Sequence, residues 1–492
     1  MFFKKSSRVI FRNYNDFGYI TDNRNFRYIK KDDNGNCIGD KILSESGAIF
    51  FSCLDSHPQL IDNIVDKIKS IFTDVDIEIL KNDANEFYYQ LKKDGFVVSG
   101  NSPQECDKND IKFSYKNTNI EKQYIQTVKE KSPQDFLEEY FKGKPQLTNV
   151  HIEIISKCNE KCVHCYIPHE NKKTEMHSNI FFSILKQCKN INVLHITISG
   201  GEPFLHKDFC NFLKKCRQYN FSVNILSNLT LLSDDIIKEM KANPLLSVQT
   251  SLYAMDPNVH DKITQKMGSF KQTKKSIIRL IENDIPLQIS CPILSLNKAF
   301  YSEVTKWADQ YNINVNNDYV IIGGYNHDIK NLEYRLSIDE VKKIINQKVT
   351  RGEIILDKIY LESEQKKEIT SNDSVCSVCH SSICIADNGN IYPCAGWQGH
   401  VLGNIKKTSL REIWETSEAT NRLRALRRRD FPKCLKCDYR DFCTMCMVRN
   451  ANESPNGDYL MVNEYYCNIA KYIKKKVVEW KKTININTEL NP

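Results

Sequence analysis

The chain has 492 residues, which is too long for one ordinary hydrophobic core, so two or three domains are expected. Its composition, 26% charged and 41% hydrophobic, is typical of a soluble globular protein. The net charge is +8, but 69 basic and 61 acidic residues are largely interspersed, which argues against a dedicated nucleic-acid-binding protein.

The amino terminus reads MFFKK, in which charge directly follows two phenylalanines without a longer apolar core, so it does not resemble a signal peptide. No uninterrupted apolar stretch is long enough to cross a bilayer, and we expect no membrane partner. Nineteen cysteines without an export signal indicate metal ligation in a reducing compartment rather than a disulfide framework. We therefore expect a cytoplasmic protein.

Residues 1–100 predict a small unit of three strands followed by three helices. The strand patterns are RVIFR, FGYIT and NFRYI, and the helical patterns after a turn-rich segment are SESGAIFFSCL, PQLIDNIVDKIKSIF and NDANEFYYQLKKDGFVV. This order predicts a winged-helix-like module. Binding of DNA, or simple packing on a neighbouring domain, remains an alternative for such a unit.

Residues 101–145 are polar and predict a linker with one anchoring helix, which Ser132 caps and Gly143 ends. From residue 146 to 325, strand and helix patterns alternate in six units. The strand patterns are VHIEII, VLHITIS, FSVNILS, LSVQTSLY, PLQISCPIL and NDYVIIGG. Such alternation predicts a parallel sheet with right-handed crossovers, in which the chemistry takes place at the carboxyl ends of the strands. Residues 326–374 predict a helical connector.

Three thiols follow the first of these strands in the spacing CxxxCxxC, at Cys158, Cys162 and Cys165. Three thiolates can hold three irons of a 4Fe-4S cube and leave the fourth iron open, whereas a closed cluster or a structural zinc site needs four ligands. At the end of the second strand stands GGEP, which comprises Gly200, Gly201, Glu202 and Pro203. Paired glycines allow close approach of the backbone to a ligand, and the carboxylate can bind an ammonium group.

Together these two motifs resemble those of the radical SAM superfamily. The resemblance implies a partial (β/α)6 TIM-type barrel and a 4Fe-4S cluster whose open iron binds S-adenosylmethionine (SAM). It also implies reductive cleavage of SAM to methionine and a deoxyadenosyl radical, with the electron supplied by a reductant such as flavodoxin or ferredoxin.

The resemblance also assigns SAM-binding residues outside the two motifs. The candidates are Tyr166 beside the cluster cysteines, Ser227 and Asn228 in a stretch similar to the family's SNGT, and Ser251 facing the ribose. Leu229 replaces the usual glycine of that stretch, and Asn297 is a further ribose candidate. The alternative to SAM binding is that each of these polar side chains lies in a turn or at a strand end and hydrogen-bonds to the backbone. His164 lies between the cluster thiols, and we do not expect it to be a ligand.

The carboxyl-terminal region, residues 375–492, holds nine cysteines that resemble those of the SPASM domain, which carries two auxiliary 4Fe-4S clusters. Carried over by position, the first cluster takes Cys376, Cys379, Cys394 and Cys446, and the second takes Cys434, Cys437, Cys443 and Cys467. The chain departs from the family spacing before Cys446, and Cys384 is an extra thiol that either replaces Cys376 or belongs to the core. A pair of zinc ribbons is the alternative. Ser409 and Glu412 predict a capping box in the same region.

The amino-terminal module resembles the PqqD-type recognition element of peptide maturases, particularly in ILSESGAIFF and LKKDGFVV. In that family a precursor leader adds as a strand to the sheet edge, which corresponds here to the strand 26–30 and the helix 84–93. Arg27 and Lys30 are either leader contacts or solvated edge charges.

The order of the three modules resembles that of maturases of ribosomally made peptides, and SLYAMDPNVHDKIT most resembles those of Cys-rich precursors, the sactipeptide and ranthipeptide group. The resemblance implies thioether formation between a peptide Cys sulfur and a carbon from which the deoxyadenosyl radical has removed hydrogen. Carbon–carbon cross-linking and epimerisation are the alternatives, followed by sulfatase-type maturation and a non-catalytic iron-sulfur peptide carrier.

Overall fold

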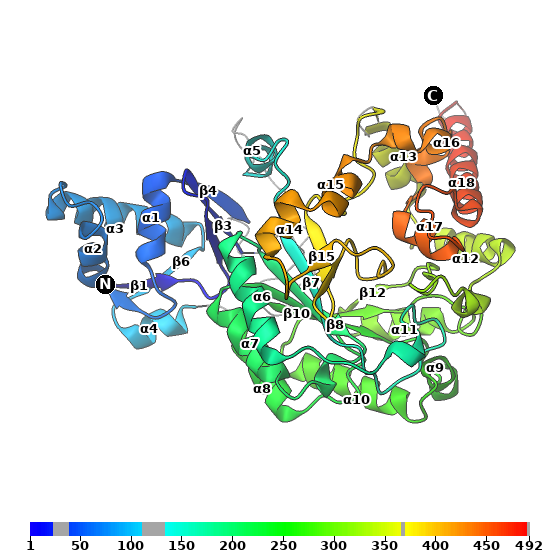
Figure 1. Ribbon diagram of the computed structural model, residues 1–492, viewed down its shortest axis with the longest axis horizontal. Helices are drawn as coiled ribbons and strands as arrows, with labels where there is room; N and C mark the ends of the chain where they lie inside the picture. Colours follow the sequence, from blue (N-terminus) through cyan, green and yellow to red (C-terminus); the bar gives the residue numbers. More distant parts are fainter. Residues whose placement is uncertain (23–38, 111–132, 366–369, 490–492) are drawn as a thin grey trace.

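A computed structural model describes residues 1–22, 39–110, 133–365 and 370–489 of the chain. The amino-terminal module lies on one side of a central parallel sheet, and the carboxyl-terminal region lies on the other (Figure 1). The predicted strand 26–30, with Arg27 and Lys30, falls outside the described residues.

The amino-terminal module contains two antiparallel sheets with the strand orders β2-β3-β4 and β5-β1-β6. Its strands are β1 Phe2–Lys5, β2 Ile10–Asn13, β3 Phe17–Thr21, β4 Asp40–Ser44, β5 Gln59–Leu60 and β6 Val97–Gly100. Its helices are α1 Glu45–Cys53, α2 Ile61–Lys69, α3 Ile77–Lys93 and α4 Pro103–Lys108. The third described strand of the first sheet is β4. The sequence analysis did not predict a strand there, because it assigns this position to the end of a turn-rich segment.

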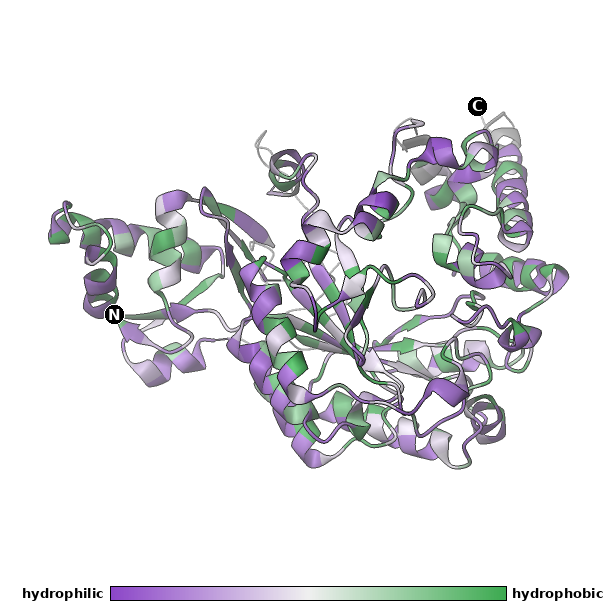
Figure 2. Ribbon diagram, in the orientation of Figure 1, coloured by the Kyte–Doolittle hydropathy of each residue, from purple (hydrophilic) through white to green (hydrophobic). Residues whose placement is uncertain are grey.

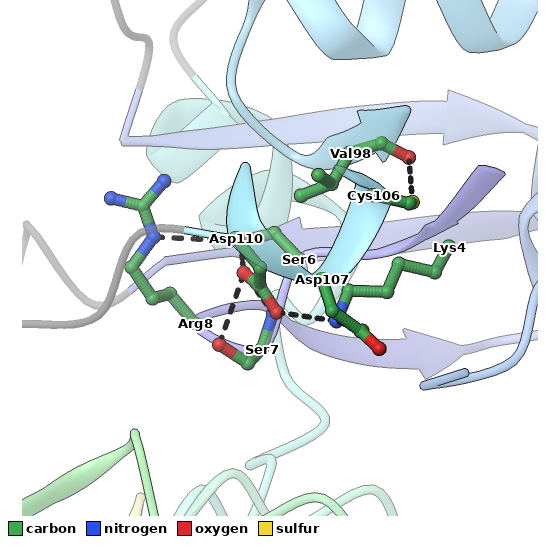
Figure 3. A network of polar contacts seen from close by, with 8 residues as sticks. All are labelled: Lys4, Ser6, Ser7, Arg8, Val98, Cys106, Asp107 and Asp110. Carbon is green, nitrogen blue, oxygen red and sulfur yellow. Dashed lines mark hydrogen bonds and ion pairs between the residues drawn. The ribbon is translucent and has the colours of Figure 1, made fainter. Parts of the chain in front are cut away.

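Contacts of this module continue past Gly100 through α4. The buried Lys4 ammonium of β1 pairs with Asp107 at 2.6 Å and with Asp110 at 2.9 Å, and Asp110 also accepts from the Ser7 amide at 3.1 Å (Figure 3). A buried lysine is stable in the charged form only when it is paired in this way. These ion pairs therefore hold α4 on the sheet.

The module docks on the amino-terminal ends of the central strands. Arg12 of β2 donates to the Val193 carbonyl at 2.8 Å and to the Asn220 carbonyl at 3.0 Å, just before strands β8 and β9 begin. An apolar cluster of β2 and β3 packs in the same region on Leu194, Leu245 and the linker helix α5 Pro133–Tyr140. Gly143, with a φ of +76°, follows α5 where the sequence predicts the helix end.

The central sheet contains six consecutive parallel strands, and the predicted fold class is confirmed. They are β7 Asn149–Ile155, β8 His195–Gly200, β9 Ser222–Leu226, β10 Leu246–Ser251, β11 Leu287–Ser290 and β12 Asn314–Asn316. The helices between them are α6 Ser178–Asn190, α7 Phe209–Gln218, α8 Asp234–Ala242, α9 Pro257–Thr264, α10 Ser269–Glu282 and α11 Tyr301–Asp309. Hydrophilic and hydrophobic residues alternate along these helices, as expected for helices with one face on a core (Figure 2).

The strands of this sheet have two different faces. Residues such as Ile152, Ile198 and Ile225 are fully buried in the main core. The alternate residues, such as Thr197 and Asn224, are polar and only partly buried. Because side chains alternate between the faces of a strand, one face packs on the helices and the other presents polar groups.

The sixth strand is shorter and earlier than predicted. The segment NDYVIIGG, residues 317–324, is irregular, and two of its carbonyl groups accept side-chain hydrogen bonds from the carboxyl-terminal region. For example, the Gly323 carbonyl accepts from the Asn452 side chain at 2.9 Å.

The connector helices α12 Ile338–Thr350 and α13 Leu356–Gln365 pack on the last helix, α18 Glu464–Glu489. The other elements of the carboxyl-terminal region are β13 Ser382–Ile385, β14 Asn390–Tyr392, β15 Gly403–Asn404, α14 Leu410–Thr416, α15 Glu418–Ala425, α16 Pro432–Leu435 and α17 Met447–Glu453. β13 pairs in parallel with β7, so this region extends the central sheet. Within the described ranges, no helix has the length and apolar character needed to cross a membrane.

Candidate functional site

The two glycines of GGEP bring the end of β8 against the loop that carries the first three cysteines. Gly200 has a φ of +132°, and a side chain on it would overlap the Ile155 carbonyl oxygen. A Cβ atom on Gly201 would lie 2.5 Å from the Ser156 oxygen, and the Gly201 amide donates to Ile155 at 2.7 Å. The sequence predicts that these glycines allow the backbone to approach a ligand. In the structure they allow the end of β8 to approach the backbone just before Cys158.

Cys158, Cys162 and Cys165 lie together on this loop, and each is partly buried. Burial raises the pKa of Cys158 to about 11. Burial, then Glu160 and the other two thiols, raises the pKa of Cys162 well above its ordinary value. Three thiols on one loop, of which Cys158 and Cys162 are costly to ionise without a cation, fit a cluster that binds them as thiolates.

Glu202 is fully buried at the start of the segment after β8. Its carboxylate accepts from the Ser227 hydroxyl at 2.7 Å, the Phe204 amide at 3.0 Å and the Asn228 amide at 2.8 Å. Burial raises the pKa of Glu202 to about 7, against the opposing effect of these bonds. A carboxylate has about four acceptor positions, so three donors leave capacity for an ammonium group.

Asn228 connects the end of β9 to the cysteine loop. Its side chain donates to Asn159 at 2.8 Å and accepts from the Thr230 amide at 3.0 Å, while Asn159 donates to the Thr230 hydroxyl at 2.7 Å. Leu229, between Asn228 and Thr230, is buried with a φ of +61°, a left-handed conformation that glycine adopts more readily than leucine does.

Ser251 and Asn297 have different positions. Ser251 ends β10 and is partly exposed, and its hydroxyl hydrogen-bonds with Tyr253. Asn297 is fully buried, donates to the Tyr253 carbonyl at 2.8 Å and accepts from the Leu294 amide at 2.7 Å. The expectation that Asn297 faces a ribose is therefore wrong, because its amide is engaged by the backbone.

His164 and Tyr166 point in different directions from the cysteine loop. The His164 ring lies against Tyr253, with 3.4 Å between its Nε2 atom and the tyrosine hydroxyl. Tyr166 donates to Glu153 Oε1 at 3.2 Å, and Gln398 of the carboxyl-terminal region donates to Glu153 Oε2. The sequence analysis did not identify Glu153 or Gln398, because their separation in the chain hides their contact.

Eight of the cysteines in the carboxyl-terminal region form two separate groups. Burial, and then the neighbouring Cys446, raises the pKa of Cys376 and of Cys394, and Cys379 is influenced by Cys376. These four make up the first predicted set.

In the second predicted set, burial and then Cys434 and Cys437 raise the pKa of Cys443. Burial and then these three thiols raise the pKa of Cys467.

Cys384 lies on β13, is 1% exposed, and has Glu153 and Cys394 as its electrostatic neighbours. In the described part of the chain, no three Cys, His, Asp or Glu side chains converge on a single-ion position. Two groups of four thiols suit the donor chemistry of 4Fe-4S clusters.

One predicted detail of this region is only half present. The Ser409 side chain accepts from the Glu412 amide at 3.2 Å, which caps α14, but the reciprocal bond of a capping box is not among the bonds of the described residues.

Comparison with known proteins identifies two domains. Residues 152–298 match the model of the radical SAM superfamily, and residues 376–438 match that of the SPASM iron-sulfur cluster-binding domain. The first match contains the three-cysteine loop and GGEP, and the second contains the start of the thiol-rich region.

Among curated proteins, the chain is 23% identical to the AdoMet-dependent heme synthase of Methanosarcina barkeri over 55% of this chain and 81% of the relative. It is also 23% identical to the antilisterial bacteriocin subtilosin biosynthesis protein AlbA of Bacillus subtilis, over 59% of this chain and 61% of the relative.

Among solved structures, SuiB of Streptococcus suis bound to the precursor peptide SuiA has the same fold. The TM-score is 0.57 and the identity 15%, over 93% of this chain and 98% of SuiB. SuiB has also been solved with S-adenosylmethionine, with a TM-score of 0.56. The chain therefore contains a radical SAM domain followed by a SPASM domain, which is an iron-sulfur cluster-binding domain.

Proposed function

We propose that this protein is a radical SAM maturase of a ribosomally synthesised Cys-rich precursor peptide and that it forms thioether cross-links. The main support is the extent of the fold match, which covers 93% of this chain and 98% of a protein solved with its precursor peptide. The likeness to a bacteriocin biosynthesis protein supports the same class of substrate.

In this proposal, Cys158, Cys162 and Cys165 hold the cluster that binds SAM, and the cofactors supply the deoxyadenosyl radical when bound. Glu202 binds the ammonium group of SAM with its remaining acceptor position. Gly200, Gly201 and Pro203 shape the segment around it. Tyr166, Ser227, Asn228 and Ser251 complete the SAM site, and flavodoxin or ferredoxin supplies the electron.

The two thiol groups of the SPASM region each hold an auxiliary 4Fe-4S cluster in this proposal. Their members are Cys376, Cys379, Cys394 and Cys446 in the first, and Cys434, Cys437, Cys443 and Cys467 in the second. Because each thiol is partly or fully buried, ligation in place of free ionisation lowers the cost of the thiolate form.

Thioether formation predicts a specific change in mass. After anaerobic reaction of the precursor with reconstituted protein, SAM and reductant, each cross-link removes two hydrogens and one alkylatable thiol from the peptide. Mass spectrometry after thiol alkylation measures both quantities. The same mass loss with all thiols still free would contradict thioether formation and indicate carbon–carbon linkage, and an unchanged mass would indicate epimerisation or a different substrate.

The amino-terminal module provides a position for the precursor leader. β4 pairs only with β3, so its outer edge has no partner strand among the described residues. The opposite edge strand of this sheet, β2, docks on the barrel. Lys41 of β4 pairs with Asp94 at the end of α3 at 2.6 Å, which places this edge beside that helix. We propose that the leader adds to β4 as a strand.

Leader binding then predicts slower amide hydrogen exchange in β4 of the full-length protein. Hydrogen-exchange mass spectrometry with a synthetic leader should show protection in residues 40–44, and β2, residues 10–13, is the matched control because its edge is already engaged. Protection of β2 alone, or none in β4 at saturating leader, would exclude this binding mode.

A further inference from the structure

Arg449 is a buried cation that the function proposed above leaves without a role. It lies on α17, and only 5% of the residue is exposed. Its guanidinium donates to the carbonyl and hydroxyl oxygens of Thr444 and lies over the ring of Tyr466, 3.8 Å from the ring centre. Among the described residues, no carboxylate lies within ion-pair distance of it. A buried positive charge is costly unless an anion compensates it.

Arg335 has the same aromatic contact but also an anionic partner. Its guanidinium lies over the ring of Tyr465, the neighbour of Tyr466 on α18, at 4.1 Å from the ring centre. It forms an ion pair with Glu453 at 2.9 Å. The two arginines therefore share the contact with a tyrosine ring, and Arg449 differs in lacking the anion.

The thiols of the second predicted cluster lie beside Arg449. Thr444, whose oxygens accept from its guanidinium, directly follows Cys443. Tyr466, whose ring it covers, directly precedes Cys467. Burial raises the pKa of the Cys443 thiol, and the charge of Arg449 opposes this increase. The guanidinium thus contacts the chain next to two predicted ligands of one cluster.

A second guanidinium group acts on the same set of thiols. The Nε atom of Arg428 is buried and has no hydrogen-bond partner among the described residues. Burial and then Cys437 raise the pKa of Cys434, and the charge of Arg428 opposes this increase, as it does for Cys443. Two positive side chains therefore act on one group of four thiols.

We propose that Arg449, together with Arg428, is the counter-charge of the second auxiliary cluster and raises its reduction potential. This inference rests on the auxiliary clusters of the proposed function. A 4Fe-4S cluster with four thiolate ligands is an anion, and its one-electron reduction adds negative charge without forming or breaking a bond. A positive charge that is shielded from water stabilises the reduced form, because it acts through a medium of low dielectric constant.

A redox titration of the reconstituted holoenzyme with dithionite tests this inference without any peptide. Absorbance and EPR spectroscopy follow the reduction steps, one for each proposed cluster. Arg449→Gln keeps a polar side chain but removes the charge, so one step should become about 10-fold or more less favourable, which is about 59 mV or more towards negative potential. The other steps should not move. Arg449→Lys keeps the charge and should restore most of the potential, and Arg428→Gln should shift the same step in the same direction.

The double variant Arg335→Gln with Glu453→Gln is the matched control. It removes both charges of the neighbouring ion pair, so the net charge near the thiols is unchanged and no step should move. An equal shift in this control would overturn the assignment. If Arg449→Gln loses about four iron atoms instead of shifting a step, full iron content in Arg449→Lys would support the charge as the cause, and loss of iron in both would overturn it.

The outcomes separate this inference from the proposed function. Unchanged reduction steps in Arg449→Gln, with its iron retained, would overturn the counter-charge even if the wild-type protein cross-links its precursor. A wild-type protein without a reducible second auxiliary cluster would also overturn it. A shifted step in a protein that leaves the precursor mass unchanged would support the counter-charge and contradict thioether formation.

Discussion

Replacement of Cys162 by alanine is expected to abolish reductive cleavage of SAM. The loop carries three thiols, and their number matches a cluster with one open iron, so the loss of one leaves too few ligands. Iron content should fall from about 12 to about 8 atoms per chain, four for each cluster, while the auxiliary clusters remain. Quantified 5′-deoxyadenosine and iron measure the two effects.

Cys210→Ala is the matched control for this variant. Cys210 is a partly buried thiol on α7, outside the three groups of cysteines, and its removal should change neither iron content nor SAM cleavage. Normal cleavage in Cys162→Ala would show that the assigned loop does not hold the SAM-binding cluster. Loss of activity in both variants would point to a general sensitivity of the fold.

Gly201→Ala is expected to be nearly as damaging, although it removes no ligand. The new methyl group would lie 2.5 Å from the Ser156 oxygen and 2.6 Å from the Lys157 carbonyl carbon, so backbone must move. Overpacking of this kind costs about 1–3 kcal/mol or more, and a shift of about 1 Å at a reacting centre costs about 10²-fold in rate. We expect reduced loading of the first cluster and at least about a 10²-fold loss of SAM cleavage.

Gly323→Ala provides the comparison for this prediction, because its nearest neighbour, the Asn452 oxygen, would be 3.4 Å from the added carbon. That separation is ordinary van der Waals contact, and the variant should retain its iron and its activity. The measurements are thermal unfolding, iron content and SAM cleavage. A Gly201→Ala variant that behaves as Gly323→Ala does would show that the loop can move without loss.

The parts predictable from the sequence are those whose residues are close together in the chain. The six alternating units follow from local apolar periodicity, and the three cysteines and GGEP each occupy a few consecutive positions at strand ends. The boundary errors arose where tertiary contacts decide the backbone, as in the segment 317–324, whose Gly323 carbonyl binds Asn452. β4 was missed because its strand follows a long polar stretch directly and continues into α1.

Contacts between distant residues were not predictable. Glu153 and Gln398 are separated by 245 positions, and neither lies in a sequence motif that predicts contact with the other. Asn297 shows the opposite error. Its polarity in the segment after a predicted strand suggested ligand binding, but its side-chain amide donates to the Tyr253 carbonyl and accepts from the Leu294 amide. Polar residue type alone does not separate these two uses.

The amino-terminal module docks at the start of the central strands, which separates the proposed leader site from the three-cysteine loop. The cysteine loop follows the opposite ends of the same strands, and β7, with seven residues, is about 23 Å long. An extended peptide covers about 3.3–3.6 Å per residue. In the proposed binding mode, a precursor held at β4 would need a spacer of at least about seven residues before its first modified position, and the distance between leader and core would then contribute to substrate selection.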